Sequence, residues 1–218
     1  MNEQDNIMYS KDERKLIEAF IEYSFGKISY IIGDKDHDEF NIAVIEPNEM
    51  EDYYKFVSIG GGAKVMNVAA EFNKEEFGRA ELVMLLPKET VDKDGGIPAI
   101  MQMIQILETP SQMNTWIGFG HTFTDGTPLT EETEMKTIGL INACDRYDNS
   151  MRMKIDDKII NYYQMIPMYD EEVLFKQRTD MREFLYQLQK EEFPPMFDIK
   201  RKNRCKQRIR DKGMEMLH

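Results

Sequence analysis

Apolar residues follow a helical period in some segments of this chain and a strand period in others. Residues 11–25 repeat apolar side chains at helical spacing, with Ser10 or Asp12 available as the N-cap and Gly26 as the stop. The pattern therefore predicts a helix over 11–25. Its apolar positions are Leu16, Ile17, Phe20, Ile21 and Phe25.

Strand-like segments are rich in β-branched and aromatic residues, and several of them are closed by glycine or proline. These predicted strands lie at 28–32, 40–47, 53–60, 79–87, 135–143 and 157–168. The segment RAELVMLLP (79–87) is nearly continuous in apolar character, which is typical of an internal strand covered on both faces.

Further helices are predicted after Gly95-Gly96 and in the last quarter of the chain, at 171–176 and 180–190. The stretch 115–134 reads as a short strand or turn followed by a loop. The helix after Gly96 is expected to bury one apolar face, made of Ile97, Ile100, Met101, Ile104 and Leu107. These elements predict a single α+β domain with a central mixed, largely antiparallel β-sheet flanked by helices.

Composition fits a water-soluble globular protein. The 218 residues are 41% hydrophobic and 31% charged, and no apolar run is long enough to cross a bilayer. The polar N-terminus does not have the pattern of a signal peptide. Cys144 and Cys205 lie far apart and form no CxxC pattern, which favours reduced thiols in a cytoplasmic protein.

The charge is unevenly distributed. The net charge is −12, yet residues 199–212 hold eight Lys/Arg and one Asp, so the rest of the chain carries −19. We therefore divide the chain into a domain at 1–198 and a basic C-terminal tail at 199–218. An acidic body repels nucleic acid and attracts a basic partner. The tail contacts phosphates, folds back onto the acidic body, or is solvated.

Two motif-like stretches do not complete a ligand site. GGGAK (60–64) lacks the upstream Gly and the Ser/Thr of a phosphate loop, and it is interpreted as a turn after a strand. DKDHDEF (34–40) has acids at alternate positions, but Glu39 and Ile45 replace the Gly and the bidentate Glu of a calcium loop. No cofactor and no metal site is predicted.

His121, in the stretch GFGHTFTDG, lies near Asp125, and such a pair can position a general base. Neither Cys144 nor any serine sits in a nucleophile turn such as GxSxG. His121 is interpreted as a hydrogen-bonded structural histidine, and no catalytic residue is predicted.

Three acids, Asp170, Glu171 and Glu172, follow an apolar strand in NYYQMIPMYDEEVLF (161–175). Acids in the first turn of a helix interact favourably with its dipole and N–H groups, each contributing about 0.3–1 kcal/mol. This helix-start role is the interpretation adopted for all three.

Four groups of residues, taken in order, resemble the suppressor-of-fused family. They are Glu81-Leu82 with Pro87; Gly120-His121 followed by Gly126 and Pro128; Pro167 followed five residues later by Glu172; and Asp198-Ile199 with Arg201. The resemblance covers residues 38–203 and is to the compact bacterial members, of immunity-protein type. The order of the groups carries it, because no single motif is diagnostic.

The resemblance implies an α+β fold with no known catalytic centre. The animal member is a two-domain protein that restrains a transcription factor by adding a partner strand to a sheet, and this chain is too short for that second domain. Bacterial members resemble immunity proteins encoded beside polymorphic toxins, often nucleases. The implied function is cytoplasmic and non-enzymatic, namely binding and neutralising a basic toxin.

Exposed acids are the predicted toxin-binding residues, with ordinary solvated side chains as the alternative interpretation. They are Asp125, Glu131, Glu132, Glu134, Asp145 and Asp148. Other functions stay open: a small hydrolase or transferase using His121 with nearby carboxylates, a regulatory protein-binding module, or nucleic-acid binding through the basic tail.

Overall fold

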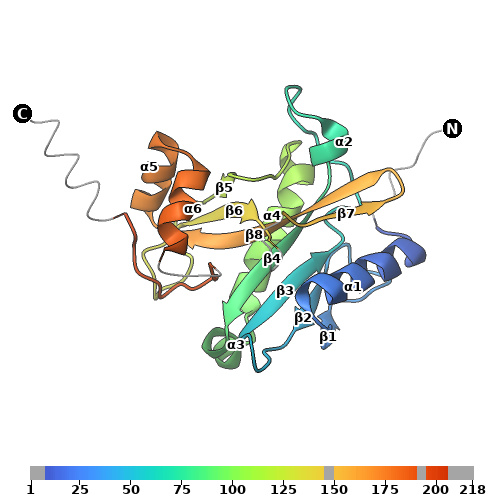
Figure 1. Ribbon diagram of the computed structural model, residues 1–218, viewed down its shortest axis with the longest axis horizontal. Coiled ribbons are helices and arrows are strands. Elements are labelled where there is room, and N and C mark those ends of the chain that lie inside the picture. Colours follow the sequence, from blue (N-terminus) through green and yellow to red (C-terminus); the bar gives the residue numbers. More distant parts are fainter. Residues whose placement is uncertain (1–7, 145–149, 191–194, 206–218) are drawn as a thin grey trace, which may run out of the picture. The chain divides into compact units, whose positions relative to one another are not determined.

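The computed structural model describes residues 8–144, 150–190 and 195–205 (Figure 1). Its helices are α1 (Lys11–Phe25), α2 (Lys74–Phe77), α3 (Lys88–Asp94), α4 (Ile97–Met113), α5 (Asp170–Arg178) and α6 (Met181–Gln189). Its strands are β1 (Tyr30–Ile32), β2 (Asn41–Ile45), β3 (Tyr53–Ile59), β4 (Ala80–Pro87), β5 (Thr122–Phe123), β6 (Thr137–Asn142), β7 (Arg152–Ile155) and β8 (Lys158–Met168).

The strands form a mixed sheet in the order β1-β2-β3-β4-β8-β6-β5, with β7 paired to β8. Strand β4 pairs in parallel with β8, whereas β1–β2, β2–β3, β3–β4, β5–β6 and β7–β8 are antiparallel. The predicted α+β domain around a mixed, largely antiparallel sheet is confirmed. Its residues group into two compact units, Met1–Phe119 with Asn142–Gln164 and Gly120–Ile141 with Met165–His218.

In the first unit, helices lie on both faces of the sheet, and Figure 1 shows α1 in front of it and α4 behind it. The predicted helix at 11–25 is confirmed, with a capping box between Ser10 and Glu13. It buries Ile17, Ile21 and Phe25. Every residue of β4 is buried, as predicted for an internal strand.

The buried face of α4 differs from the prediction. Ile97 and Met101 are 62% and 52% exposed, whereas the buried residues are Ala99, Ile100, Met103, Ile106 and Leu107. Ile97 and Met101 lie on the same side of the helix as the polar residues Gln105, Glu108 and Gln112, and the buried face is the neighbouring arc centred on Met103.

The second unit contains β5, β6, the last residues of β8, α5 and α6. The predicted amphipathic helix at 180–190 is confirmed as α6, which starts at the N-cap Asp180 and buries Met181, Phe184 and Leu188. Gly139 in β6 allows close packing, because a Cβ there would lie 2.6 Å from the Met168 sulfur. Among the described helices of both units, none combines the length and apolar character needed to cross a membrane.

Candidate functional site

A buried carboxylate, Glu81, lies in the all-buried strand β4 of the first unit. Its oxygens accept hydrogen bonds from the Tyr9 hydroxyl at 2.8 Å and from the Ser58 hydroxyl. The backbone N–H groups of glycines 60–62 also donate to it, at 3.0, 3.2 and 3.1 Å in chain order. Burial raises the pKa of Glu81, and these hydrogen bonds from Ser58, the glycines and Tyr9 oppose the rise.

The glycine run explains how this arrangement forms. It follows β3 as the predicted turn, and Gly60 has a φ of +132°, which favours glycine. A Cβ on Gly61 would lie 2.6 Å from both the Ala80 carbonyl oxygen and the Leu107 side chain. The turn therefore does more than reverse the chain: its N–H groups bind an internal carboxylate.

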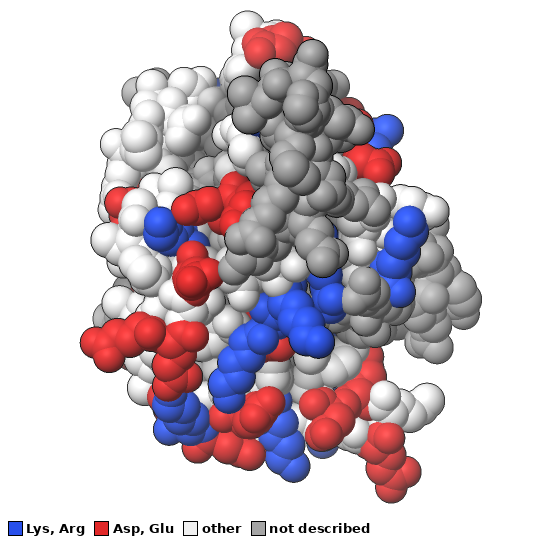
Figure 2. Space-filling model, turned by 90° about the vertical axis from the view of Figure 1, so that its left-hand side faces the viewer, with Lys and Arg blue, Asp and Glu red and all other residues white. Residues whose placement is uncertain are grey.

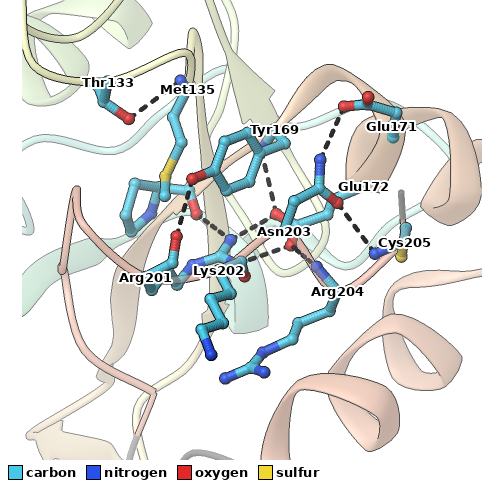
Figure 3. Close-up of polar contacts among 11 residues, drawn as sticks. Thr133, Met135, Tyr169, Glu171, Glu172, Arg201, Lys202, Asn203, Arg204 and Cys205 are labelled. Carbon is cyan, nitrogen blue, oxygen red and sulfur yellow. Dashed lines mark hydrogen bonds and ion pairs between the residues drawn. The ribbon is translucent and has the colours of Figure 1, made fainter. Parts of the chain in front are cut away.

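A second buried carboxylate, Glu172, lies in the second unit and forms an ion pair with Arg201 (Figure 3). Arg201 donates to both carboxylate oxygens, from Nη1 at 2.6 Å and from Nη2 at 2.5 Å, and Nη2 also donates to the Pro167 carbonyl. Backbone N–H groups of Tyr169 and Arg204 each donate to Glu172 at 3.0 Å. Glu172 is 0% and Arg201 2% exposed at the side chain.

Glu172 has the predicted helix-start role, as the N3 residue of a capping box, and this ion pair adds a second role. Asp170 is exposed in the first turn of α5, as that interpretation expects, and forms an ion pair with Lys136 at 3.1 Å. Glu171 accepts a hydrogen bond from Asn203. Glu172 does bond the N–H before the helix, but its principal partner is Arg201, 29 residues further along the chain.

The charge pattern assigned residues 199–205 to a basic tail, yet two of them are buried. Arg201 is 5% and Cys205 0% exposed, and the Tyr169 hydroxyl donates to the Arg201 carbonyl at 2.7 Å. Figure 3 shows this segment running beside Glu171 and Glu172. The start of the basic segment is thus packed against the first turn of α5, whereas residues 206–218 lie outside the described part.

The predicted partner-binding acids lie in the loop between β5 and β6. Asp125, Glu131, Glu132 and Glu134 are exposed there, in a stretch (124–134) without Lys or Arg. The loop is locally ordered: Asp125 accepts hydrogen bonds from the Thr127 N–H and hydroxyl, at 2.8 and 2.6 Å, which lower its pKa. Asp145 and Asp148 lie outside the described residues. Figure 2 shows that acidic and basic side chains are interspersed on the face it displays.

His121 is partly buried before β5, and its carbonyl accepts a hydrogen bond from the Leu140 N–H at 2.9 Å. We expect His121→Gln to leave folding and partner binding unchanged, because a structural histidine contributes hydrogen bonds that an amide can also make. Thermal unfolding and partner affinity of the purified variant check this. Full loss of function in a folded His121→Gln protein would instead favour catalysis by His121.

The remaining motif positions have backbone roles. Pro87 ends β4 opposite Tyr53. Gly120 and Gly126 have φ values of +83° and +85°, and the Gly120 N–H donates to the Leu140 carbonyl. The Pro167 carbonyl accepts from Arg201.

Sequence reasoning missed the partners of both carboxylates. The signal for Glu81 was available, because a glutamate inside an internal apolar strand needs hydrogen-bond donors. The donors, however, come from two separate segments: Tyr9 before α1, and Ser58 with glycines 60–62 at the end of β3. Within the described residues, no cluster of three His, Cys, Asp or Glu is placed to hold a metal ion.

The first unit also contains a cavity of about 540 Å³ between the glycine turn, the following loop (64–67) and α4. Gly60, Gly61 and Ala80 line it beside Glu81. His121, Asp125 and the acids at 170–172 are not among its lining residues.

Comparison with known proteins agrees with this fold. Residues 36–202 match the family model described as Suppressor of fused protein (SUFU). The crystal structure of a SUFU homolog from Neisseria gonorrhoeae FA 1090 has a TM-score of 0.59 at 15% identity, over 89% of this chain and 98% of that chain. The structure described as the Sufu-Fu complex has a TM-score of 0.64 at 12% identity, over 88% and 91%. No curated protein matches the chain.

Proposed function

Because this chain belongs to the suppressor-of-fused family, we propose that it is a non-enzymatic immunity protein, which binds a cognate polymorphic toxin and neutralises it in the cytoplasm. The toxin is basic, most simply a nuclease, since nucleases are positively charged where they meet nucleic acid. The exposed acidic loop between β5 and β6 is the observation that carries this proposal.

The loop is suited to a basic partner because it is acidic and because hydrogen bonds hold it in a defined conformation. Its four acids lie within 124–134, and hydrogen bonds hold the loop closed, including one from the Leu129 N–H to the Met135 carbonyl at 2.8 Å. Exposed acids on an ordered loop accelerate encounter with a basic surface and lose little entropy on binding.

Two further observations support a binding role, and a third supports the proposed location. The buried carboxylates Glu81 and Glu172 are already hydrogen-bonded within the protein, so neither is poised as a free acid or base. One of the similar folds belongs to a protein crystallised in a complex, the Sufu-Fu complex. Cys144 and Cys205 are thiols, which suits a reducing cytoplasm.

The proposal is tested by finding the partner and asking whether it is toxic. The tagged protein is used to retain partners from native lysate at moderate salt, under conditions that induce toxin expression. Each stoichiometric partner is then expressed alone and together with this chain. We expect one basic partner that arrests growth alone and not in co-expression. A harmless partner would instead favour a regulatory binding module.

Charge reversal of the loop should weaken toxin binding. We expect the variant Asp125→Lys/Glu131→Lys/Glu132→Lys/Glu134→Lys to bind the toxin at least about tenfold more slowly at low salt, because electrostatic steering is lost. The difference should shrink as salt is raised. Stopped-flow association rates measure it.

A matched variant controls for the change in net charge. It reverses four other exposed acids, all in the first unit: Glu46, Glu49, Asp52 and Glu71. If both variants slow association equally, the loop is not the binding surface and only the total charge matters.

A further inference from the structure

The cavity of the first unit has a firmly held floor. Gly60 and Gly61 line it, and their N–H groups donate to the buried Glu81 carboxylate. A Cβ on Gly61 would clash with the Ala80 carbonyl oxygen and with the Leu107 side chain, both at 2.6 Å. Glycine at this position therefore lets the turn pack closely against β4 and α4, and Glu81 holds in place the turn that forms the floor of the cavity.

The charged side chains that line the cavity carry a net positive charge, opposite in sign to that of the protein. Two lysines, Lys64 and Lys74, and one acid, Glu39, line it, in a chain of net charge −12. Lys64 forms an ion pair with Glu39 at 2.8 Å, whereas Lys74 makes no ion pair with any described residue. The ammonium of Lys74 is thus available to a ligand, and a cationic cleft concentrates anions.

The other lining residues combine polar and apolar side chains, as is usual in sites that bind small molecules. Asn67, Ser111 and Asn114 supply polar groups, and Leu107 and Ile117 are apolar and buried. A volume of about 540 Å³ lies within the range of about 300–1,000 Å³ that such sites occupy.

We propose that this cavity binds a small organic anion, with its carboxylate or phosphate group at Lys74 and its apolar part against Leu107 and Ile117. The site goes beyond toxin binding, because it lies in the first unit and involves none of the acids of the loop at 124–134.

The single tryptophan provides the readout. Trp116 precedes the lining residue Ile117 and packs against Phe72 with its ring tilted, at 5.0 Å between ring centroids. The purified full chain is titrated with benzoate and with phenyl phosphate, and Trp116 fluorescence is followed at constant ionic strength. Benzyl alcohol, which lacks the charge, and inorganic phosphate, which lacks the ring, are the comparison probes.

We expect saturable binding of at least one aromatic anion, with a dissociation constant on the order of 1 mM, as for a ligand of this size. Lys74→Glu should weaken it by about tenfold or more, because an attractive charge becomes repulsive. Lys27→Glu, an exposed charge reversal away from the lining, should not. Benzoate and phenyl phosphate show which anionic group is preferred.

Three results would overturn the proposal: no saturable binding of either aromatic anion to the wild-type chain, equal affinity in Lys74→Glu and Lys27→Glu, or binding of benzyl alcohol as tight as that of the anions. Both lysines are exposed at the surface, so we expect both variants to fold, and thermal unfolding verifies it.

Discussion

Replacing Arg201 by alanine is expected to lower the free energy of unfolding by about 3–5 kcal/mol, the usual cost of leaving one partner of a buried ion pair alone. Arg201 is the only side chain seen to donate to Glu172 among the described residues, and Glu172 is fully buried. Without the guanidinium, a carboxylate remains in the core beside the Pro167 carbonyl, which loses its donor as well. Urea-induced unfolding measures the loss.

Two other substitutions distinguish the effect of losing the ion pair from the effect of losing a positive charge. Lys202→Ala removes a positive charge one residue later at an exposed position and should change stability by less than about 0.5 kcal/mol. Arg201→Lys keeps the charge but loses the bidentate hydrogen bonds to Glu172. Its free energy of unfolding should therefore lie between those of Arg201→Ala and Lys202→Ala.

A paired replacement tests whether the charge or the contact matters. Glu172→Leu with Arg201→Met should be more stable than Arg201→Ala, because an apolar pair leaves no uncompensated charge. If the free energy of unfolding of Arg201→Ala is within about 1 kcal/mol of the wild-type value, the ion pair does not hold residues 199–205 in place.

Glu81→Ala is expected to be the other most damaging substitution, lowering the free energy of unfolding by at least about 3 kcal/mol. The glycine N–H groups at 60–62 and the Ser58 and Tyr9 hydroxyls would lose their acceptor in a buried place, and each unsatisfied buried group costs about 1–3 kcal/mol. The two hydroxyls can rotate toward other acceptors or toward water. The backbone N–H groups of the glycine turn cannot rotate in this way, so they stay without an acceptor.

Variants that remove one hydrogen-bond donor at a time show how much of the stability lost in Glu81→Ala comes from each hydroxyl. Ser58→Ala and Tyr9→Phe each remove one donor and leave the carboxylate with the others, so each should cost about 1 kcal/mol from the lost hydrogen bond. If Glu81→Ala costs no more than either of them, the carboxylate is not what holds the glycine turn.

The pH dependence of Glu81→Gln follows from the raised pKa of Glu81. Because the folded-state pKa lies above the unfolded value near 4.5, the carboxyl favours folding most below that value, and this contribution is lost as pH rises through the folded-state pKa. Gln does not titrate, so the stability difference between wild type and Glu81→Gln should be larger near pH 5 than at pH 8. A difference that grows with pH would contradict the direction of the shift.

Much of the fold was predictable because local patterns and tertiary packing agree. The helix at 11–25 has its own N-cap and a stripe of apolar residues, and the apolar composition of the strand at 79–87 indicates that it is buried. The family resemblance, taken from the order of short motifs over 38–203, agrees with the match over 36–202. The predicted face of α4 was wrong at Ile97 and Met101, which lie on the polar side of the helix with Gln105, Glu108 and Gln112, although Ile100 and Leu107 of that face are buried.

The sequence by itself determined the longer helices and strands, though not α2, α3 or β7, and it determined the acidic composition with its basic C-terminal segment and the positions of Glu81, Glu172 and Arg201 as motif residues. Only the tertiary structure decided what those residues do. Glu81 meets its donors from segments 19 to 72 residues away, and Glu172 meets Arg201 across 29 residues. Hydrogen bonds and ion pairs act over a few ångströms in space, and spacing along the chain does not show which distant groups the fold brings that close.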